Sequence, residues 1–317
     1  MNMRLLRIGV LIAVAAGAIS VALMMTYRLR STPEPSRPQF EKNKAVPPSA
    51  PQTSNSPYKC VTEGNPVVAH GGGTLLVNGF LIEVKPVADP SDPAGMMCQV
   101  SIRSPNGEIV FDGDNNVGGI DIDPVTGKDL NGDGEPDAVV VDDSGSVHYN
   151  DYIYSIISLG QKPGPIQQVE GIAHFMDLNR AGKIEIIVAD SLLGLHGLST
   201  PDSPSALLVL RLRGNTLEEV GAEFPNFYDD EIKEDLAELK NSNVTVARAP
   251  NEQNKVLSIV LDYLYSGRSQ QARSVLDQFW PPDDRESVRK DIVEEYCHGY
   301  RSRLGLATDS VCKAGDF

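Results

Sequence analysis

The residues with the clearest chemical pattern lie in one short acidic segment, residues 129–137. Oxygen-bearing side chains stand at its positions 1, 3, 5 and 9 and a glycine stands at position 6: Asp129, Asn131, Asp133, Asp137 and Gly134. Ca²⁺ binds roughly six to eight oxygen atoms, and a loop that turns sharply at a glycine can aim alternate side chains at one point. We therefore predict a calcium site formed by these four side chains, completed by the backbone carbonyl of Glu135 and by water.

Two other interpretations of this segment compete with a calcium loop between strands. An EF-hand loop needs an acidic residue at position 12, but that position is Val140, inside an apolar run typical of a strand. The EF-hand interpretation therefore fails. An acidic, glycine-rich hairpin turn that binds no metal stays open as the alternative.

The loop resembles the calcium loops of FG-GAP/VCBS repeats, the units of integrin-type β-propellers, in which such a turn joins two strands. A degenerate second loop follows 48 residues later, with Asp177, Asn179, Gly182 and Glu185 at positions 1, 3, 6 and 9. Its position 5 is Ala181, which has no oxygen ligand, so we expect this loop to keep the turn and to bind calcium weakly or not at all. Residues 112–116 form a third candidate, which lacks the glycine at position 6 and the acid at position 9.

The resemblance covers about residues 110–220, roughly a third of the chain, and it implies a fold and a metal rather than an activity. Integrin-type propellers have several blades of about 50–60 residues, whereas only about 160 residues here are rich in β signals. A complete seven-bladed ring does not fit. We expect a mainly β fold, either a partial propeller or a β-sandwich with FG-GAP-like repeats, followed by a small α-helical C-terminal region.

Local patterns indicate the elements that position the loops. Asn78 and Gly79 between two apolar runs predict a two-residue hairpin, because this pair accepts the positive φ angles of a type I′ turn. Further β-branched runs predict strands at residues 99–103, 108–111, 138–141, 147–159, 184–189, 206–212 and 216–220. From residue 229 the apolar spacing becomes helical, and Asp283 with Glu286 predicts a capping box that opens the last long helix.

The N-terminal part has the composition of a targeting segment and a linker. Residues 8–25 are apolar, and as a helix they would extend about 27 Å, close to the thickness of a bilayer core. An uncleaved signal anchor competes with a signal peptide cleaved near residues 16–18. Residues 31–57 contain seven prolines, as expected of an extended linker. We divide the chain into residues 1–30 (anchor or signal peptide), 31–57 (proline-rich linker), 58–225 (β domain with the calcium loop) and 226–317 (helical region).

Four cysteines follow the apolar segment, and an even number in an exported chain indicates disulfides. Among the three possible pairings, proximity in sequence favours Cys60 with Cys98 and Cys297 with Cys312. No two of them form a Cys-x-x-Cys motif, so the sequence supports neither a redox motif nor a thiolate zinc site.

The net charge and the motifs limit the classes of function that the sequence supports. The net charge is −15, and because residues 1–44 carry +5 the remaining residues carry −20. This argues against nucleic acid as the main partner, since phosphate binding needs clustered Lys and Arg. The His-Gly-Gly-Gly run at residues 70–73 resembles an esterase oxyanion hole, but no Gly-x-Ser-x-Gly nucleophile motif accompanies it.

We therefore expect a non-enzymatic, calcium-binding interaction module. It would be extracytoplasmic, tethered to the membrane by its N-terminal segment, and would contact an envelope or extracellular protein. The alternative function is a secreted hydrolase or an accessory subunit of an envelope enzyme. The alternative location is secreted or periplasmic after signal cleavage.

Overall fold

The computed structural model describes residues 56–64, 67–92, 94–143, 145, 152–307 and 309–317, within a unit that runs from Ala45 to Phe317. The predicted anchor or signal peptide and nearly all of the proline-rich linker lie outside the described residues. Within these described ranges, none of the helices combines the length and the apolar character that crossing a membrane requires.

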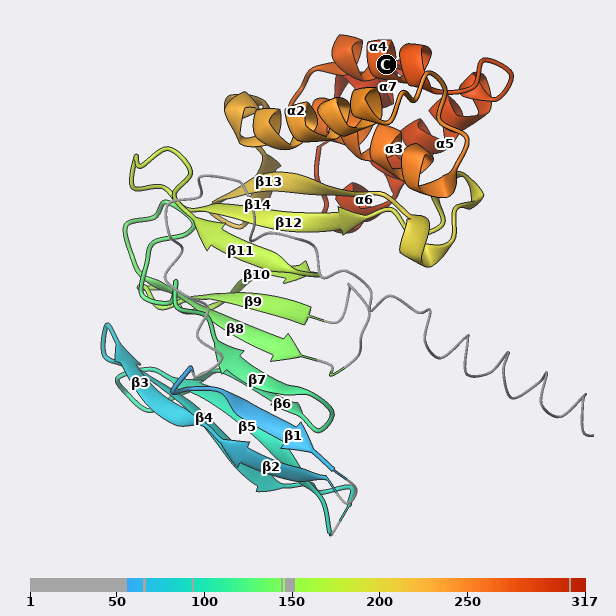
Figure 1. The fold of residues 1–317 in the computed structure, drawn as a ribbon. Coiled ribbons are helices and arrows are strands. Elements are labelled where there is room, and N and C mark those ends of the chain that lie inside the picture. The colour runs from blue at the N-terminus through green and yellow to red at the C-terminus, as the bar shows by residue number, and fades with distance from the viewer. Residues whose placement is uncertain (1–55, 65–66, 93, 144, 146–151, 308) are drawn as a thin grey trace, which may run out of the picture. The chain divides into compact units, whose positions relative to one another are not determined.

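The described strands form three antiparallel sheets, none of which closes on itself (Figure 1). The central sheet has six strands in the order β10-β9-β8-β7-β1-β2, and the other two are meanders of four, β3-β4-β5-β6 and β11-β12-β13-β14. The predicted mainly β character is confirmed. In chain order the strands are β1 (Cys60–Glu63), β2 (Val68–Gly71), β3 (Gly73–Val77), β4 (Phe80–Ala88), β5 (Met96–Arg103), β6 (Ile109–Asn115), β7 (Gly119–Ile122), β8 (Asp137–Asp143), β9 (Tyr152–Ser158), β10 (Gly164–Glu170), β11 (Ala173–Met176), β12 (Glu185–Ser191), β13 (Ser205–Arg213) and β14 (Thr216–Glu219).

The hairpin predicted at Asn78 and Gly79 is confirmed. Val77 pairs with Phe80, so β3 and β4 are joined by two residues. Asn78 has φ 50° and Gly79 has φ 82°, the pair of positive angles that a type I′ turn requires.

The glycine run before β3 serves close packing of the backbone. Gly72 has φ +89°, and a Cβ at this residue would lie 2.3 Å from the carbonyl oxygen of Val84 on β4. Only glycine allows this approach. Residues 70–73 therefore have a structural role in the connection from β2 to β3.

Strand β8 in the central sheet is buried on both faces. Side chains alternate between the faces of a strand, and on β8 this places Val139 and Val140 in different cores. Val140 packs with residues of the β3–β6 sheet such as Ile82 and Val100. Val139 belongs to the larger core, which also contains residues of the β11–β14 sheet such as Val188. The central sheet thus lies between the two meanders.

The C-terminal region is helical, as predicted, and it covers the β11–β14 sheet on the side away from the central sheet (Figure 1). Its helices join the larger core, where the side chain of Trp280 is fully buried. The helices are α2 (Pro225–Asn241), α3 (Pro250–Tyr265), α4 (Ser269–Phe279), α5 (Arg285–His298), α6 (Tyr300–Arg303) and α7 (Ser310–Ala314).

The prediction of a capping box at Asp283 and Glu286 is wrong. Helix α5 begins at Arg285, its N-cap residue is Asp284, and no side chain caps it. The Asp284 carboxylate instead contacts the ring of His196 at 2.7 Å. With Asp284 as the N-cap residue, Glu286 stands at N2 rather than at the N3 position that a capping box requires.

Both disulfides join the pairs that proximity favours, Cys60 with Cys98 and Cys297 with Cys312. The second ties α5 to α7 across a separation of 15 residues. Replacing both Cys297 and Cys312 with serine is expected to lower the free energy of unfolding by about 3 kcal/mol. Without the disulfide, the unfolded chain gains the conformational entropy that closing a loop of this length removes. Urea unfolding measures this loss, and an unchanged midpoint would contradict it.

Candidate metal centre

The two predicted loops occupy the same place in successive sheets. Residues 129–137 belong to the connection from β7 to β8, and Asp137 is the first residue of β8. Residues 177–185 join β11 to β12, and Glu185 is the first residue of β12. In both cases the loop joins two hydrogen-bonded antiparallel neighbours, so its ninth position begins the second strand.

The backbone of the two loops turns in the same way. Position 4 has a positive φ in both loops, 80° at Gly132 and 59° at Arg180. Position 6 does too, with 86° at Gly134 and 80° at Gly182. A side-chain-bearing residue seldom adopts this conformation, and Arg180 does so here because the surrounding turn imposes it.

Three hydrogen bonds recur at equivalent positions. The carboxylate at position 1 accepts from the N–H at position 6, the oxygen at position 3 accepts from the N–H at position 5, and the acid at position 9 accepts from the N–H at position 2. In the first loop these bonds run from Gly134 to Asp129 (2.9 Å), from Asp133 to Asn131 (2.9 Å) and from Leu130 to Asp137 (2.8 Å). In the second they run from Gly182 to Asp177 (2.7 Å), from Ala181 to Asn179 (3.0 Å) and from Leu178 to Glu185 (3.1 Å).

The loops differ at the second oxygen of the position 9 acid. Asp137 is fully buried, its Oδ2 accepts the Leu130 N–H, and its Oδ1 has no hydrogen-bond partner among the described residues. The pKa of Asp137 is raised to about 7, chiefly by burial and in smaller part by the nearby Asp133 and Asp129 carboxylates, while the Leu130 N–H opposes the change. A buried carboxylate oxygen without a donor is costly, so this site favours a cation.

The second loop already contains a cation. Glu185 is fully buried, and its Oε1 accepts from Nη2 of Arg211 at 2.8 Å and from Nε at 3.2 Å. Arg211 lies directly opposite Glu185 on β13 and also binds Glu223 at 2.9 Å. In the first loop the residue opposite Asp137 is Ser158, which carries no charge. A guanidinium thus neutralises the second loop, whereas the described residues supply no such group to the first.

The residue types of the first loop fit calcium. Asp129, Asn131, Asp133 and Asp137 with the Glu135 carbonyl offer only oxygen donors, as a hard cation requires. The carboxylates of Asp129 and Asp133 accept N–H groups of their own loop. Within the described ranges, no three His, Cys, Asp or Glu side chains are gathered as a metal-binding group. The unpartnered Asp137 oxygen is therefore the feature that favours a metal here.

The prediction of a third loop at residues 112–116 is wrong. Asp112 and Asp114 lie within β6 and pair with Ser101 and Gln99 of β5. Without a glycine at position 6, this acidic segment continues as a strand rather than turning.

Sequence reasoning missed Arg211 as the partner of Glu185. Arg211 is the one charged residue in the apolar run of residues 206–212, and a lone charge in a run that is typical of a buried strand is a signal that could have identified it. Its partner lies 26 residues away, which no local pattern reveals.

A second missed cluster surrounds His196 in the β12–β13 connection. One ring nitrogen contacts Asp291 at 2.6 Å and the other contacts Asp284 at 2.7 Å. Burial lowers the pKa of His196, but the bonds to Asp291 and Asp284 outweigh it, and the net change is upward. The cluster joins the β11–β14 sheet to α5, and it offers no nucleophile.

Comparison with protein-family models, with curated proteins and with solved structures finds no match to this chain.

Proposed function

We propose that the chain is an exported, membrane-tethered, calcium-binding protein of FG-GAP/VCBS-like repeats that acts as a non-enzymatic interaction module. The observation that carries the calcium assignment is the buried Asp137 carboxylate, whose Oδ1 lacks a partner among the described residues at the position where the second loop holds a guanidinium. The ion would be held by Asp129, Asn131, Asp133, the carbonyl of Glu135, and Asp137.

The bound ion would act structurally. It supplies a positive charge against the three ligand carboxylates, Asp129, Asp133 and Asp137. It favours the folded state because the unfolded chain does not assemble the site. The loop precedes β8, which is buried in the central sheet. Calcium would thereby fix the β7–β8 connection and the position of β8.

The strand order supports a partial propeller as the finer description of the fold. Residues of β3–β6, β7–β10 and β11–β14 form three successive four-stranded meanders, and β1 and β2 extend the middle one. The meanders pack face to face, as propeller blades do. Helices take the outer face of the last meander, where a further blade would pack.

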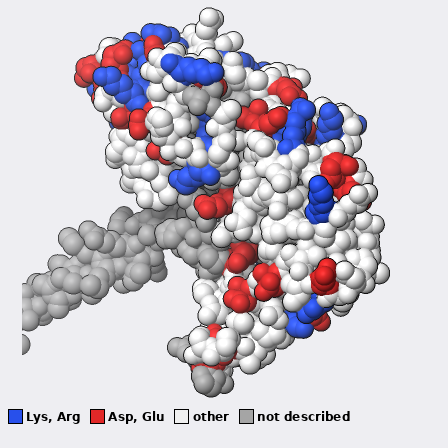
Figure 2. All heavy atoms as spheres, turned by 180° about the vertical axis from the view of Figure 1, so that it is seen from behind, with Lys and Arg blue, Asp and Glu red and all other residues white. Residues whose placement is uncertain are grey.

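Export and a protein partner are supported by composition and charge. Two disulfides are typical of an oxidising compartment. The apolar N-terminal segment followed by a proline-rich linker suits a tether. Figure 2 shows one face on which basic side chains are scattered among acidic ones, a surface that suits an envelope or extracellular protein better than a polyanion.

Thermal unfolding in calcium and in EDTA tests the proposal. At free calcium about 100 times the Kd, the full-length chain in a mild detergent is expected to gain about 2.7 kcal/mol, a Tm increase of roughly 5–10 °C. Asp133→Ala gives the first loop the position 5 residue of the second loop, and we expect it to abolish the increase.

Asp177→Ala is the matched control, because it removes a carboxylate from the neutralised loop and should leave the calcium-induced increase intact. A wild-type Tm that is equal in calcium and EDTA would contradict the calcium assignment. Turnover of a hydrolase substrate that a single carboxylate substitution abolishes would contradict the non-enzymatic role.

A further inference from the structure

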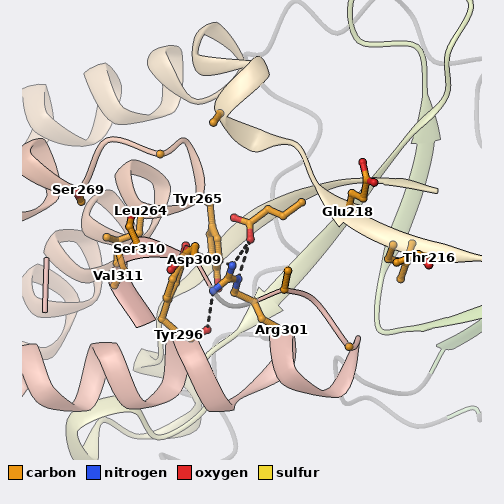
Figure 3. Close-up of a pocket in the computed structure, with 16 residues that line it drawn as sticks. Thr216, Glu218, Leu264, Tyr265, Ser269, Tyr296, Arg301, Asp309, Ser310 and Val311 are labelled. Carbon is orange, nitrogen blue, oxygen red and sulfur yellow. Dashed lines mark hydrogen bonds and ion pairs between the residues drawn. The ribbon is translucent and has the colours of Figure 1, made fainter. Parts of the chain in front are cut away.

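A cavity of about 660 Å³ lies between the edge strand β14 and the helical region (Figure 3). This volume is within the roughly 300–1,000 Å³ that is usual for ligand pockets. Small residues such as Ala222, Gly267 and Ala307 leave the space open, and Tyr265 and Tyr296 line another part of it.

One Arg lines the cavity, and each nitrogen of its guanidinium already donates a hydrogen bond within the protein. Nε and Nη2 of Arg301 donate to Oε2 of Glu219 at 2.8 and 2.5 Å, and Nη2 also donates to Asp309 at 3.2 Å. Nη1 donates to the Tyr296 carbonyl oxygen and to Sγ of Cys312, and the guanidinium stacks 4.1 Å from the centre of the Tyr296 ring. Arg301 therefore has no donor to spare for an anionic ligand.

The remaining charge of the cavity is negative. Glu218, Glu219 and Asp309 line it together with Arg301, and Arg213, which is not a lining residue, pairs with Glu218 at 2.6 Å, so three carboxylates face two cations. Both bonds from Arg301 to Glu219 fall on Oε2. Burial raises the pKa of Glu219, and Arg301 offsets this only in part. A positively charged ligand would complement these carboxylates.

The cavity follows the edge of β14. Thr216, Leu217, Glu218 and Glu219 all line it, although successive side chains of a strand point to opposite faces. Four consecutive lining residues therefore indicate that the cavity runs along the backbone edge of the strand. In the sheet as described, β14 pairs with β13 alone, so its outer edge can accept a further strand.

The opposite wall is held in place before any ligand binds. The Cys297–Cys312 disulfide joins α5 to α7. The Tyr296 hydroxyl donates to Asp309 at 2.5 Å, and Asp309 also accepts from the N–H of Cys312 at 3.0 Å. Such preorganisation lowers the ordering cost of binding.

We propose that this cavity binds an extended segment of a partner protein, which pairs with the edge of β14 and places Lys or Arg side chains against Glu219 on one face of the strand and against Glu218 on the other. The inference rests on the interaction function proposed above and supplies the place and the chemistry of that interaction. Backbone pairing would provide affinity, and the carboxylates would select the basic side chain.

The test selects a phage-displayed library of random heptapeptides on the full-length chain in a mild detergent. We expect enriched peptides to carry Lys or Arg among β-branched residues. Fluorescence anisotropy then measures the affinity of an enriched peptide for variants of the cavity. Ala307→Trp, which fills the space, and Glu218→Lys, which reverses an exposed charge, should each weaken binding by about tenfold or more.

Two matched controls accompany these variants. Ala94→Trp adds the same ring at an exposed site in the β4–β5 connection, and Glu234→Lys makes the same charge change on the exposed face of α2; both should bind the peptide as the wild type does. No enrichment, enrichment of acidic peptides, or unchanged binding by Ala307→Trp would overturn the proposal. Equal affinity for free arginine amide would also overturn it and would indicate a small-cation site. Asp133→Ala should keep peptide binding, so failure of the calcium assignment is distinguishable from failure here.

Discussion

Replacing Arg211 with alanine is expected to lower the free energy of unfolding by about 3–5 kcal/mol, the loss typical of a buried ion pair broken on one side. The guanidinium is the cation of the second loop, and its removal leaves the buried Glu185 carboxylate with the Leu178 N–H as its one donor among the described residues. Urea unfolding of wild type and variant in EDTA measures the difference without a contribution from calcium.

Arg213→Ala is the matched control for this prediction. Arg213 lies two residues further along β13 and pairs with Glu218 at 2.6 Å, but both side chains are about half exposed. Exposed pairs contribute about 0–1 kcal/mol, so this variant should unfold nearly as the wild type does. Equal losses in Arg211→Ala and Arg213→Ala would contradict the view that the second loop depends on an internal cation.

A second large effect is expected in the pH dependence of stability, to which the buried Asp190 contributes. Asp190 lies on β12, is buried against α3, and accepts a hydrogen bond from the Tyr265 hydroxyl. Burial raises its pKa from 3.8 to about 6, although the Tyr265 bond opposes the change. The folded state thus favours the protonated carboxyl. Its contribution to stability is fully present below the unfolded pKa of 3.8 and is lost as pH rises through about 6.

Asp190→Asn isolates this contribution. Between about pH 4 and pH 7 the wild type should lose about 3 kcal/mol more stability than the variant, because a pKa that is about two higher in the folded state than in the unfolded state corresponds to a free-energy difference of that size. Asparagine can still accept the Tyr265 hydroxyl, so the contact is kept while the titration is removed. Denaturant unfolding across this range in EDTA gives the two profiles, and parallel profiles would contradict a protonated Asp190.

Local signals predicted much of the fold. The hairpin at Asn78 and Gly79 forms because the two residues themselves accept the turn angles. The loop at residues 129–137 turns as the glycine spacing indicates, with Gly134 at φ 86°. The β-branched run at residues 184–189 lies in β12, apart from its first residue, since such residues suit a buried strand.

Tertiary contacts decided what the sequence did not reveal. Helix α5 begins one residue later than its predicted capping box requires, and its N-cap residue, Asp284, directs its carboxylate to His196, 88 residues earlier. The contrast between the loops depends on Arg211 and Ser158, residues that face position 9 across a strand pair. A cross-strand register becomes visible only once the strands are paired, so the sequence alone could show two similar loops but not which of them already contains a cation.

The two loops differ in how the buried carboxylate at position 9 is neutralised. Each begins a strand with a buried carboxylate at position 9, and each satisfies one oxygen of that carboxylate with the N–H at position 2. In the second loop Arg211 satisfies the other oxygen. We propose that calcium does so in the first.

Isothermal titration of the full-length chain with calcium tests this account most directly. The account predicts one calcium ion per chain for the wild type. It predicts no binding for Asp137→Asn, which keeps an acceptor for the Leu130 N–H but loses the charge. No heat of binding at millimolar calcium, or binding that Asp137→Asn leaves unchanged, would contradict the account.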